Sequence, residues 1–167
     1  MSPAGRYINP DLRQLVAERA EHLCEYCLIH EDDTYLGCEI DHIISLKHGG
    51  SSDADNLAYA CSFCNRHKGS DVGSVLNGAE FVRFYNPRKD RWAEHFQLDG
   101  LNIQAFTSIG AATAKILLFN TDERLLERES LIDLGRYPSL AAMKLQSPPG
   151  QSKFDQMPER AGKQQGK

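Results

Sequence analysis

The chain has 167 residues, of which 41% are hydrophobic and 25% are charged, and its formal net charge is −4. This length and composition fit one globular domain with a modest core, and no apolar run approaches the roughly 18 residues needed to cross a bilayer. The N-terminus has no hydrophobic segment of the kind found in secretory signals. We therefore expect a cytoplasmic protein without a membrane partner, in which the five cysteines stay reduced.

The charges are distributed unevenly. Residues 1–64 carry four Lys or Arg against eleven Asp or Glu, whereas residues 65–91 carry six against three. The net charge argues against a nucleic-acid partner, but a local basic patch is compatible with phosphate binding, because such contacts act over a short range. A solvated surface explains the charges equally well. Phe84, Tyr85 and Trp92 lie among these basic residues and fit either a strand-binding surface or a core.

The first predicted element is a helix over residues 10–23, which follows an N-terminal arm at 1–9. Asn9 is a typical capping residue, Pro10 suits the first helical position, and Asp11 is an acid in the first turn. Apolar residues then recur at helical spacing. The segment 35–46 reads as a strand or hairpin, and a short helix is expected over 65–71.

Two further strand segments are expected, at 80–87 and at 95–106. The dipeptide Asp99-Gly100 is typical of a two-residue hairpin turn. Such a turn pairs Leu98 with Leu101 and Phe96 with Ile103.

Helices are predicted from Ser108 to Phe119 and from Thr121 to Leu134, where Gly135 ends the second one. The remaining C-terminal segment is polar and rich in Pro, Gly and Gln, which is typical of disorder. We divide the chain into an arm (1–9), a core (10–73), an extension with a β-hairpin and two helices (74–138), and a disordered tail (139–167).

Two Cys-x2-Cys pairs are the clearest chemical signal: a first knuckle, Cys24 to Cys27, and a second knuckle, Cys61 to Cys64. A two-residue gap lets one tight turn aim two thiolates at one ion, and two such turns complete a tetrahedral site for structural zinc. Chance spacing or a redox pair is the alternative. Cys38 is expected to be a small buried residue rather than a ligand.

The stretch "EIDHIIS" (39–45) places Asp41 and His42 side by side in an apolar run. Neighbours on a strand point to opposite faces, so we expect a bend or bulge to bring them toward a common centre. A carboxylate and an amide oxygen, as in Asn56 or Asn65, are hard ligands suited to Mg²⁺ or Mn²⁺. A neutral imidazole beside them can deprotonate water near pH 7. Metal ligands beside a general base are the groups that one-metal hydrolysis of a phosphodiester requires.

In order along the chain, "CEYC…EIDHIISLKHGGSSDADNLAYACSFCNRHKG" contains a CxxC, an Asp-His pair, a Gly-Gly loop, an Asn-Leu, and a CxxC followed by Asn and Lys. This pattern closely resembles the zinc-containing branch of the HNH nucleases, over roughly residues 24–69. The resemblance implies an α+β fold with a ββα-metal core, the His-Me finger, braced by the four-cysteine zinc site. The segment after residue 80 also resembles the C-terminal extension of small, stand-alone bacterial HNH proteins. This second resemblance implies no roles for residues there.

The resemblance also implies roles for single residues. His42 would be the general base, Asp41 and Asn65 would bind the catalytic metal ion, and Asn56 would hold the loop that orients the base. The last motif position is Asn65 rather than His, which keeps an oxygen ligand. His67 is a rival ligand, ranked lower because residues two apart on a helix point away from each other. Arg66 and Lys68 would contact phosphates.

The sequence therefore predicts an endonuclease that hydrolyses DNA phosphodiester bonds with one divalent ion, Mg²⁺ or Mn²⁺, and a separate structural zinc. RNA stays open as a substrate, and the chain could act as a monomer or a dimer. Two alternatives are a non-catalytic zinc-containing module that binds nucleic acid and a protein-interaction domain scaffolded by zinc.

Overall fold

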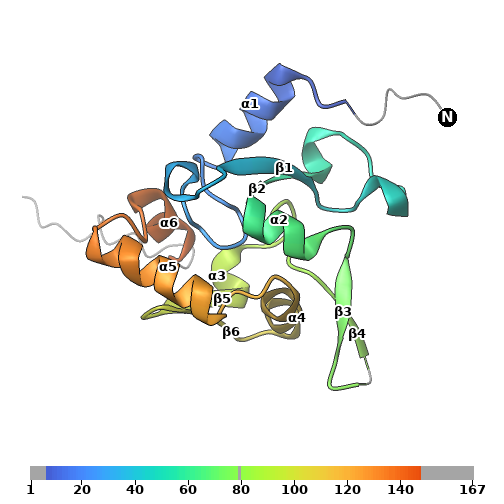
Figure 1. The fold of residues 1–167 in the computed structure, drawn as a ribbon. Helices are drawn as coiled ribbons and strands as arrows, with labels where there is room; N and C mark the ends of the chain where they lie inside the picture. The colour runs from blue at the N-terminus through green and yellow to red at the C-terminus, as the bar shows by residue number, and fades with distance from the viewer. Residues whose placement is uncertain (1–6, 79, 148–167) are drawn as a thin grey trace, which may run out of the picture.

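The computed structural model describes residues 7–78 and 80–147 (Figure 1). The expected α+β character is confirmed, since short helices and small sheets alternate along the chain. The helices are α1 (Pro10–Arg19), α2 (Ser62–Lys68), α3 (Trp92–His95), α4 (Ser108–Ile116), α5 (Asp122–Asp133) and α6 (Leu140–Leu145). The strands are β1 (Cys38–His42), β2 (Leu57–Cys61), β3 (Gly73–Leu76), β4 (Glu80–Arg83), β5 (Phe96–Asp99) and β6 (Asn102–Ala105). Three 3-10 turns are η2 (Glu31–Asp33), η3 (Leu46–His48) and η4 (Ala54–Asn56).

Helix α1 begins as predicted and ends earlier. The side chain of Asn9 accepts the amide N–H of Leu12 at 2.8 Å, and Pro10 is the first helical residue. The helix stops at Arg19, because Glu21 and His22 adopt φ angles of 49° and 58°. These left-handed conformations turn the chain toward the first knuckle, so the predicted helical end at residue 23 is wrong.

Strands β1 and β2 form an antiparallel pair, and α2 follows directly (Figure 1). All five residues of β2 are buried. Ala58 and Ala60 face the main core, whereas Leu57 and Tyr59 face a smaller cluster that includes Val16 of α1. The alternation follows the two-residue period of a strand, and it places β2 between α1 and the rest of the molecule.

A second hairpin, β3–β4, extends from the body of the molecule (Figure 1), and β3 was not predicted. In the third hairpin, Leu98 pairs with Ile103 and Asp99 with Asn102. The predicted pairings of Leu98 with Leu101 and of Phe96 with Ile103 are therefore wrong. Gly100 has a φ of 57°, and it takes the first position of the two-residue loop, where a type II′ turn requires glycine, rather than the second.

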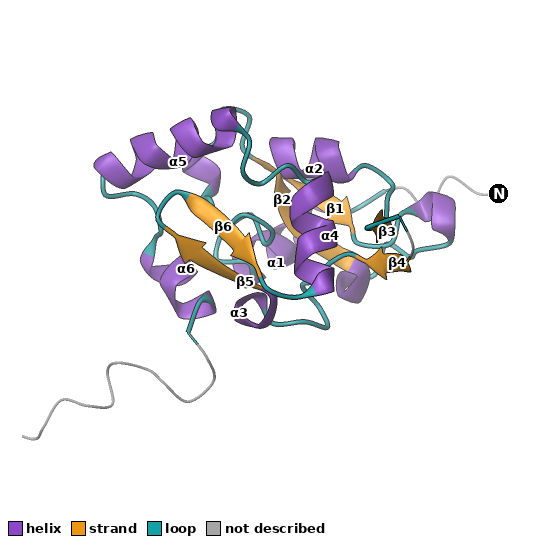
Figure 2. Ribbon diagram, turned by 90° about the horizontal axis from the view of Figure 1, so that it is seen from below, coloured by secondary structure: helices purple, strands orange, loops and turns teal. Residues whose placement is uncertain are grey.

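Helix α4 packs against β3, β4 and β6, and Figure 2 shows it beside the β5–β6 hairpin. Its cap is Thr107, whose hydroxyl accepts the amide N–H of Gly110 at 3.0 Å. Helix α5 ends before Gly135, as predicted. Helix α6 lies inside the segment expected to be disordered, so that expectation is wrong for its first residues. Residues 148–167 and 1–6 lie outside the described part of the chain.

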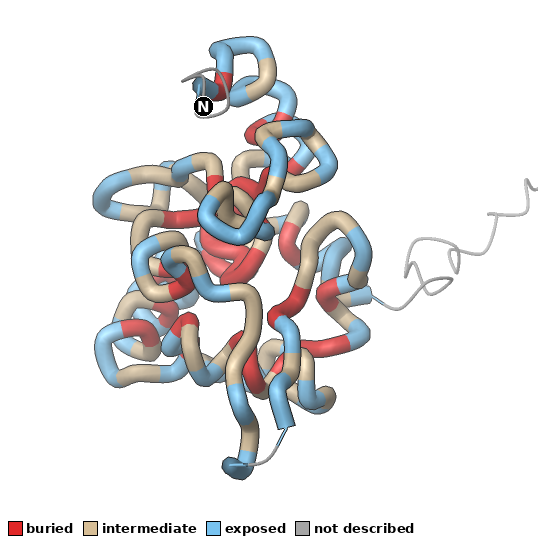
Figure 3. The backbone as a smooth tube through the Cα atoms, turned by 90° about the vertical axis from the view of Figure 1, so that its right-hand side faces the viewer, coloured by how far each residue is buried: buried red, intermediate tan, exposed pale blue. Residues whose placement is uncertain are grey.

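One hydrophobic cluster joins the two halves of the chain. It runs from Leu23 beside the first knuckle to Ala142 in α6. Phe84, Tyr85 and Trp92 are buried within it, so these aromatic residues belong to the core. Figure 3 shows buried stretches of the backbone (red) inside the molecule. Among the described residues, no helix is both long and apolar enough to traverse a lipid bilayer.

Candidate active site and metal centre

Four cysteines from the two knuckles meet in the interior. The Sγ atoms of Cys24, Cys27, Cys61 and Cys64 all lie within 4.8 Å of one another, and all four residues are buried. The sulfurs of Cys27 and Cys61 are 3.8 Å apart. A tetrahedral centre with Zn–S bonds of about 2.3 Å has sulfur–sulfur edges of about 3.8 Å. The donor set and its spacing therefore fit a closed four-thiolate metal centre.

The backbone turn in each knuckle directs its two thiols toward the common centre. In the first knuckle, the amide of Leu28 donates to the carbonyl of Cys24 at 2.8 Å, and Leu28 has a φ of 63° that turns the chain back. In the second knuckle, Cys61 precedes α2 and its sulfur accepts the amide N–H of Cys64 at 3.4 Å. Cys38 is half-buried and stands outside the four-sulfur group, which agrees with a packing role.

Asp41 is buried between a tyrosine and a lysine. Its Oδ2 accepts the hydroxyl of Tyr26 at 2.7 Å, and its Oδ1 accepts the ammonium of Lys68 at 2.9 Å. Burial raises the pKa of the Asp41 carboxyl, while Lys68 and Tyr26 act in the opposite direction. Pairing in β1 is regular through Asp41 and His42, so the expected bend or bulge is absent from this strand, and the two side chains leave opposite faces.

His42 is the last residue of β1 and is partly exposed. Its Nε2 lies 2.9 Å from the hydroxyl of Ser52 in the loop between β1 and β2. Partial burial lowers the pKa of His42, Asp41 opposes this effect, and Lys68 adds to it. The lowered pKa favours the neutral imidazole at pH 7, which is the form that can accept a proton.

Asn56 holds the loop that carries the partner of His42. Its Oδ1 accepts the amide of Ile44 at 3.0 Å, and its Nδ2 donates to the carbonyls of Ile44 and Ser51 at 2.8 and 2.7 Å. One side chain thus ties both ends of the Gly-Gly loop together. This contact set suits the positioning role that the family resemblance implied for Asn56.

A shallow opening of about 310 Å³ brings the candidate residues together. Asp41, His42 and Asn65 line it, with Lys47 at its edge. The Nδ2 of Asn65 donates to the carboxylate of Glu39 at 2.6 Å, so the amide oxygen is the atom that would serve a metal ion.

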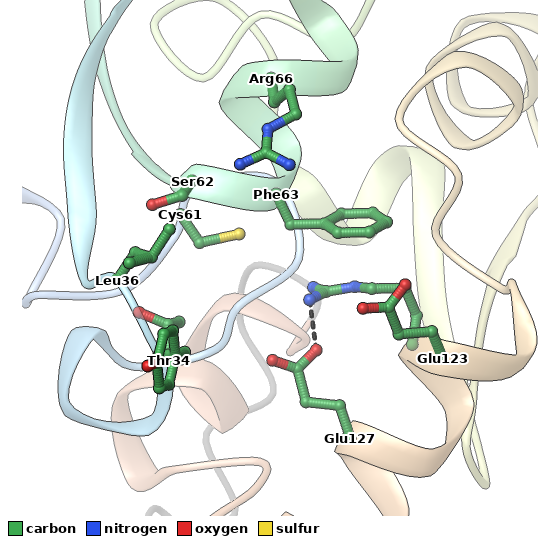
Figure 4. A pocket seen from close by; sticks show the side chains of 10 residues that line it. Thr34, Leu36, Cys61, Ser62, Phe63, Arg66, Glu123 and Glu127 are labelled. Carbon is green, nitrogen blue, oxygen red and sulfur yellow. Dashed lines mark hydrogen bonds and ion pairs between the residues drawn. The ribbon is translucent and has the colours of Figure 1, made fainter.

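The remaining predicted residues lie elsewhere. The ring of His67 lies against that of Phe63, with centroids 4.3 Å apart and the planes tilted by 52°, and His67 does not line the opening. Arg66 is exposed but faces a different pocket, beside α5 (Figure 4).

Lys68 is 1% exposed, and its ammonium is occupied by Asp41 and by the carbonyl of His42 at 2.9 Å. In this arrangement Lys68 offers no cation to a phosphate. The predicted phosphate contact does not agree with that placement.

The antiparallel pair β1–β2, the helix α2 behind it and the joint opening of Asp41, His42 and Asn65 define a ββα fold with a four-cysteine metal centre at its base. Residues 24–71 match the family model described as HNH endonuclease. The resemblance found in the sequence is confirmed for this segment by the match. No curated protein and no solved structure shows a significant match to the chain.

Three site residues were not singled out from the sequence: Tyr26, Glu39 and Ser52. Glu39 could have been found, because residues two apart on a strand share a face and Glu39 therefore accompanies Asp41. Tyr26 lies inside the first knuckle and reaches Asp41 only through tertiary packing. Ser52 is an ordinary loop serine by composition, and nothing local marks it as the partner of His42.

Proposed function

We propose that the protein is a metal-dependent endonuclease that hydrolyses phosphodiester bonds of DNA. The observation that carries the proposal is the shared opening of Asp41, His42 and Asn65, within the segment that matches the HNH model. Nuclease activity is general in this family. For this chain we propose the reaction, the divalent ion that it uses and the residues that carry it out.

His42 is the proposed general base. Its pKa is lowered, its ring is oriented by Ser52, and Asn56 holds the loop on which Ser52 lies. A water molecule between the scissile phosphate and His42 would give its proton to the imidazole and attack phosphorus. The attack would form a new phosphorus–oxygen bond and break the bond between phosphorus and the 3′ oxygen, which takes a proton from solvent. The products would be a 5′-phosphate and a 3′-hydroxyl.

Asp41 and Asn65 are the proposed ligands of a divalent ion, Mg²⁺ or Mn²⁺. Bound there, the ion would supply electrostatic stabilisation of the phosphate and of the leaving oxygen. Both oxygens of Asp41 already accept a hydrogen bond, but each carboxylate oxygen has two lone pairs, so capacity for a further contact remains. The four cysteines are proposed to hold a structural zinc ion.

One observation favours a second candidate. A buried Asp41 paired with Lys68 is also what a purely structural aspartate would show. A non-catalytic module that binds nucleic acid through the same zinc-braced fold is therefore the alternative. It needs no base and no second metal ion.

Cleavage of supercoiled plasmid DNA by zinc-loaded protein tests the proposal, with EDTA, Mg²⁺ or Mn²⁺ added. We expect His42→Ala to reduce the rate at least about 100-fold, since a general base contributes that much or more. His48→Ala is the matched control, because His48 is exposed in the same loop and does not line the opening. Equal cleavage by wild type and His42→Ala would contradict the assignment. DNA binding without ion-dependent cleavage would favour the non-catalytic module.

A further inference from the structure

The C-terminal extension reaches the cysteine cluster through α5. Arg124 is 3% exposed, and its Nη2 lies 3.2 Å from the Sγ of Cys27. Its Nη1 forms an ion pair with Glu127, one turn further along α5. The guanidinium carbon also lies 4.4 Å from the ring centroid of Phe63 in the second knuckle. A single side chain from the extension thus contacts both knuckles.

Figure 4 shows the pocket of about 370 Å³ in which these groups meet. Cys61, Ser62 and Phe63 approach from the second knuckle, and Glu123 and Glu127 approach from α5. The dashed line marks the ion pair made by Glu127. Arg124 also lines this pocket, and its side chain reaches from α5 to the sulfur of Cys27.

Electrostatics explains why a cation belongs there. A Zn²⁺ ion held by four thiolates carries a net charge of about −2, and here it would be buried. Burying a guanidinium is also costly unless it is paired and hydrogen-bonded. Glu127 is 29% exposed and so compensates Arg124 only in part. An N–H donor directed at a thiolate lowers the cost for both buried charges.

Two further contacts come from the same part of the chain. The hydroxyl of Tyr137 donates to the carbonyl of Cys27 at 3.0 Å, and the indole N–H of Trp92 donates to the carbonyl of Tyr26 at 2.9 Å. Both hold the backbone of the first knuckle, whereas Arg124 touches a sulfur. Arg124 is therefore the contact that acts on the charge of the centre.

We propose that Arg124 is the charge partner of the zinc–thiolate centre and that it retains the metal ion, so that the extension completes the zinc site of the HNH domain. This inference rests on the proposed zinc ion and is independent of cleavage. It makes Arg124 a positioning residue: by holding the second knuckle, it also fixes α2, on which Asn65 lies.

The first test measures zinc release from the full chain to an excess of a chromogenic chelator. We expect Arg124→Met to release zinc at least ten times faster than wild type, and Arg124→Lys to recover part of the slow release, because it keeps the charge. Glu123→Gln is the matched control, since Glu123 lines the same pocket on the same helix and is exposed. Its release rate should equal that of wild type.

The second test uses protein loaded with Co²⁺ in place of zinc. A hydrogen bond to a thiolate stabilises the sulfur electrons, so its loss should move the sulfur-to-cobalt charge-transfer band to longer wavelength. If Arg124→Met does not fold, Arg124→Lys carries the same comparison, because its ammonium cannot reproduce the planar contact.

Two results would overturn the inference. Normal zinc content with unchanged release and an unshifted cobalt band, in a folded Arg124 variant, would overturn it alone. Wild-type protein that binds no zinc would overturn the zinc assignment together with it. Plasmid cleavage tests the proposed nuclease function and is measured independently of both zinc experiments.

Discussion

Lys68 joins the strand that carries Asp41 and His42 to the helix that carries Asn65. Its ammonium contacts the Asp41 carboxylate and the His42 carbonyl, each at 2.9 Å, and both charged side chains are almost fully buried. A buried ion pair of this kind adds little over an apolar pair, but breaking it leaves an uncompensated charge. The pair therefore fixes the position of α2 relative to β1.

Replacing Lys68 with Met should destabilise the protein by about 3–5 kcal/mol, because Asp41 then loses its cation in a buried position. Urea unfolding measures the change. Lys47→Met is the control, an exposed lysine at the edge of the same opening, and it should cost no more than about 0.5 kcal/mol. Asp41→Asn combined with Lys68→Met should cost less than the two single changes added together. Strict additivity would show that the pair is not coupled.

At the scale of elements, the Gly-Gly loop between β1 and β2 is closed by Asn56. A Cβ atom on Gly50 would lie 1.8 Å from the Ile44 carbonyl oxygen and 2.7 Å from Asn56 Nδ2. Gly49 differs: it has a φ of 84°, and a Cβ there would meet nothing within 4 Å. Gly50 is thus required because a side chain would collide with its neighbours, whereas Gly49 is required because of its left-handed backbone conformation.

Gly50→Ala should therefore destabilise the protein more than Gly49→Ala, which carries only a conformational cost of about 1 kcal/mol. The larger loss arises because Asn56 must release the Ile44 backbone. Thermal unfolding compares the two variants, and amide exchange at Ile44 reports whether the clamp has opened. Equal losses, with Ile44 still protected in Gly50→Ala, would contradict this account of the loop.

The features that could be predicted from the sequence are those determined by residues close together in the chain. The Asn9-Pro10 helix start, the stop at Gly135 and the cysteine spacing each follow from a few neighbouring residues. The β5–β6 register did not, because either residue of an Asp-Gly pair can begin the turn region and the choice depends on packing. Strand β3 and helix α6 were missed because they are short. Strand β3 pairs with the neighbouring β4 but also packs on α4, and α6 packs against the main core through Ala142. Likewise, the family motif indicated His42, Asp41, Asn65 and Lys68, but the contact of Lys68 with Asp41 could not be predicted from it. Tyr26 and Arg124 lie outside the predicted site, and their contacts arise only from tertiary packing.

For the whole molecule, the predicted boundary between core and extension at residue 73 does not separate two hydrophobic cores. One cluster contains Ala58 and Ala60 of β2 together with Phe96, Phe119 and Ala142. The knuckle contacts of Trp92, Arg124 and Tyr137 cross the same boundary. The HNH motif and the extension therefore share one hydrophobic core, and we expect them to unfold together.

A fragment ending at residue 73 should lack cooperative unfolding even with zinc, although it contains every motif residue, because it loses its main apolar cover. A chain ending at residue 147 keeps all described contacts and serves as the control, with stability close to that of the full chain. Far-UV circular dichroism during thermal unfolding distinguishes them. A sharp transition in the short fragment would show that residues 1–73 fold without the extension.

The bond from Tyr137 to the Cys27 carbonyl has a consequence for synthesis on the ribosome. It spans 110 positions of the chain, so both knuckles leave the ribosome long before their outer cover exists. Until α5 and Tyr137 have been synthesised, the four cysteines would form an uncovered cluster that is open to oxidants and to competing metals. Contacts so distant in sequence form late. Capture of an ion by the four cysteines and its enclosure by this contact would thus be separate events, and the second waits until residue 137 has been synthesised.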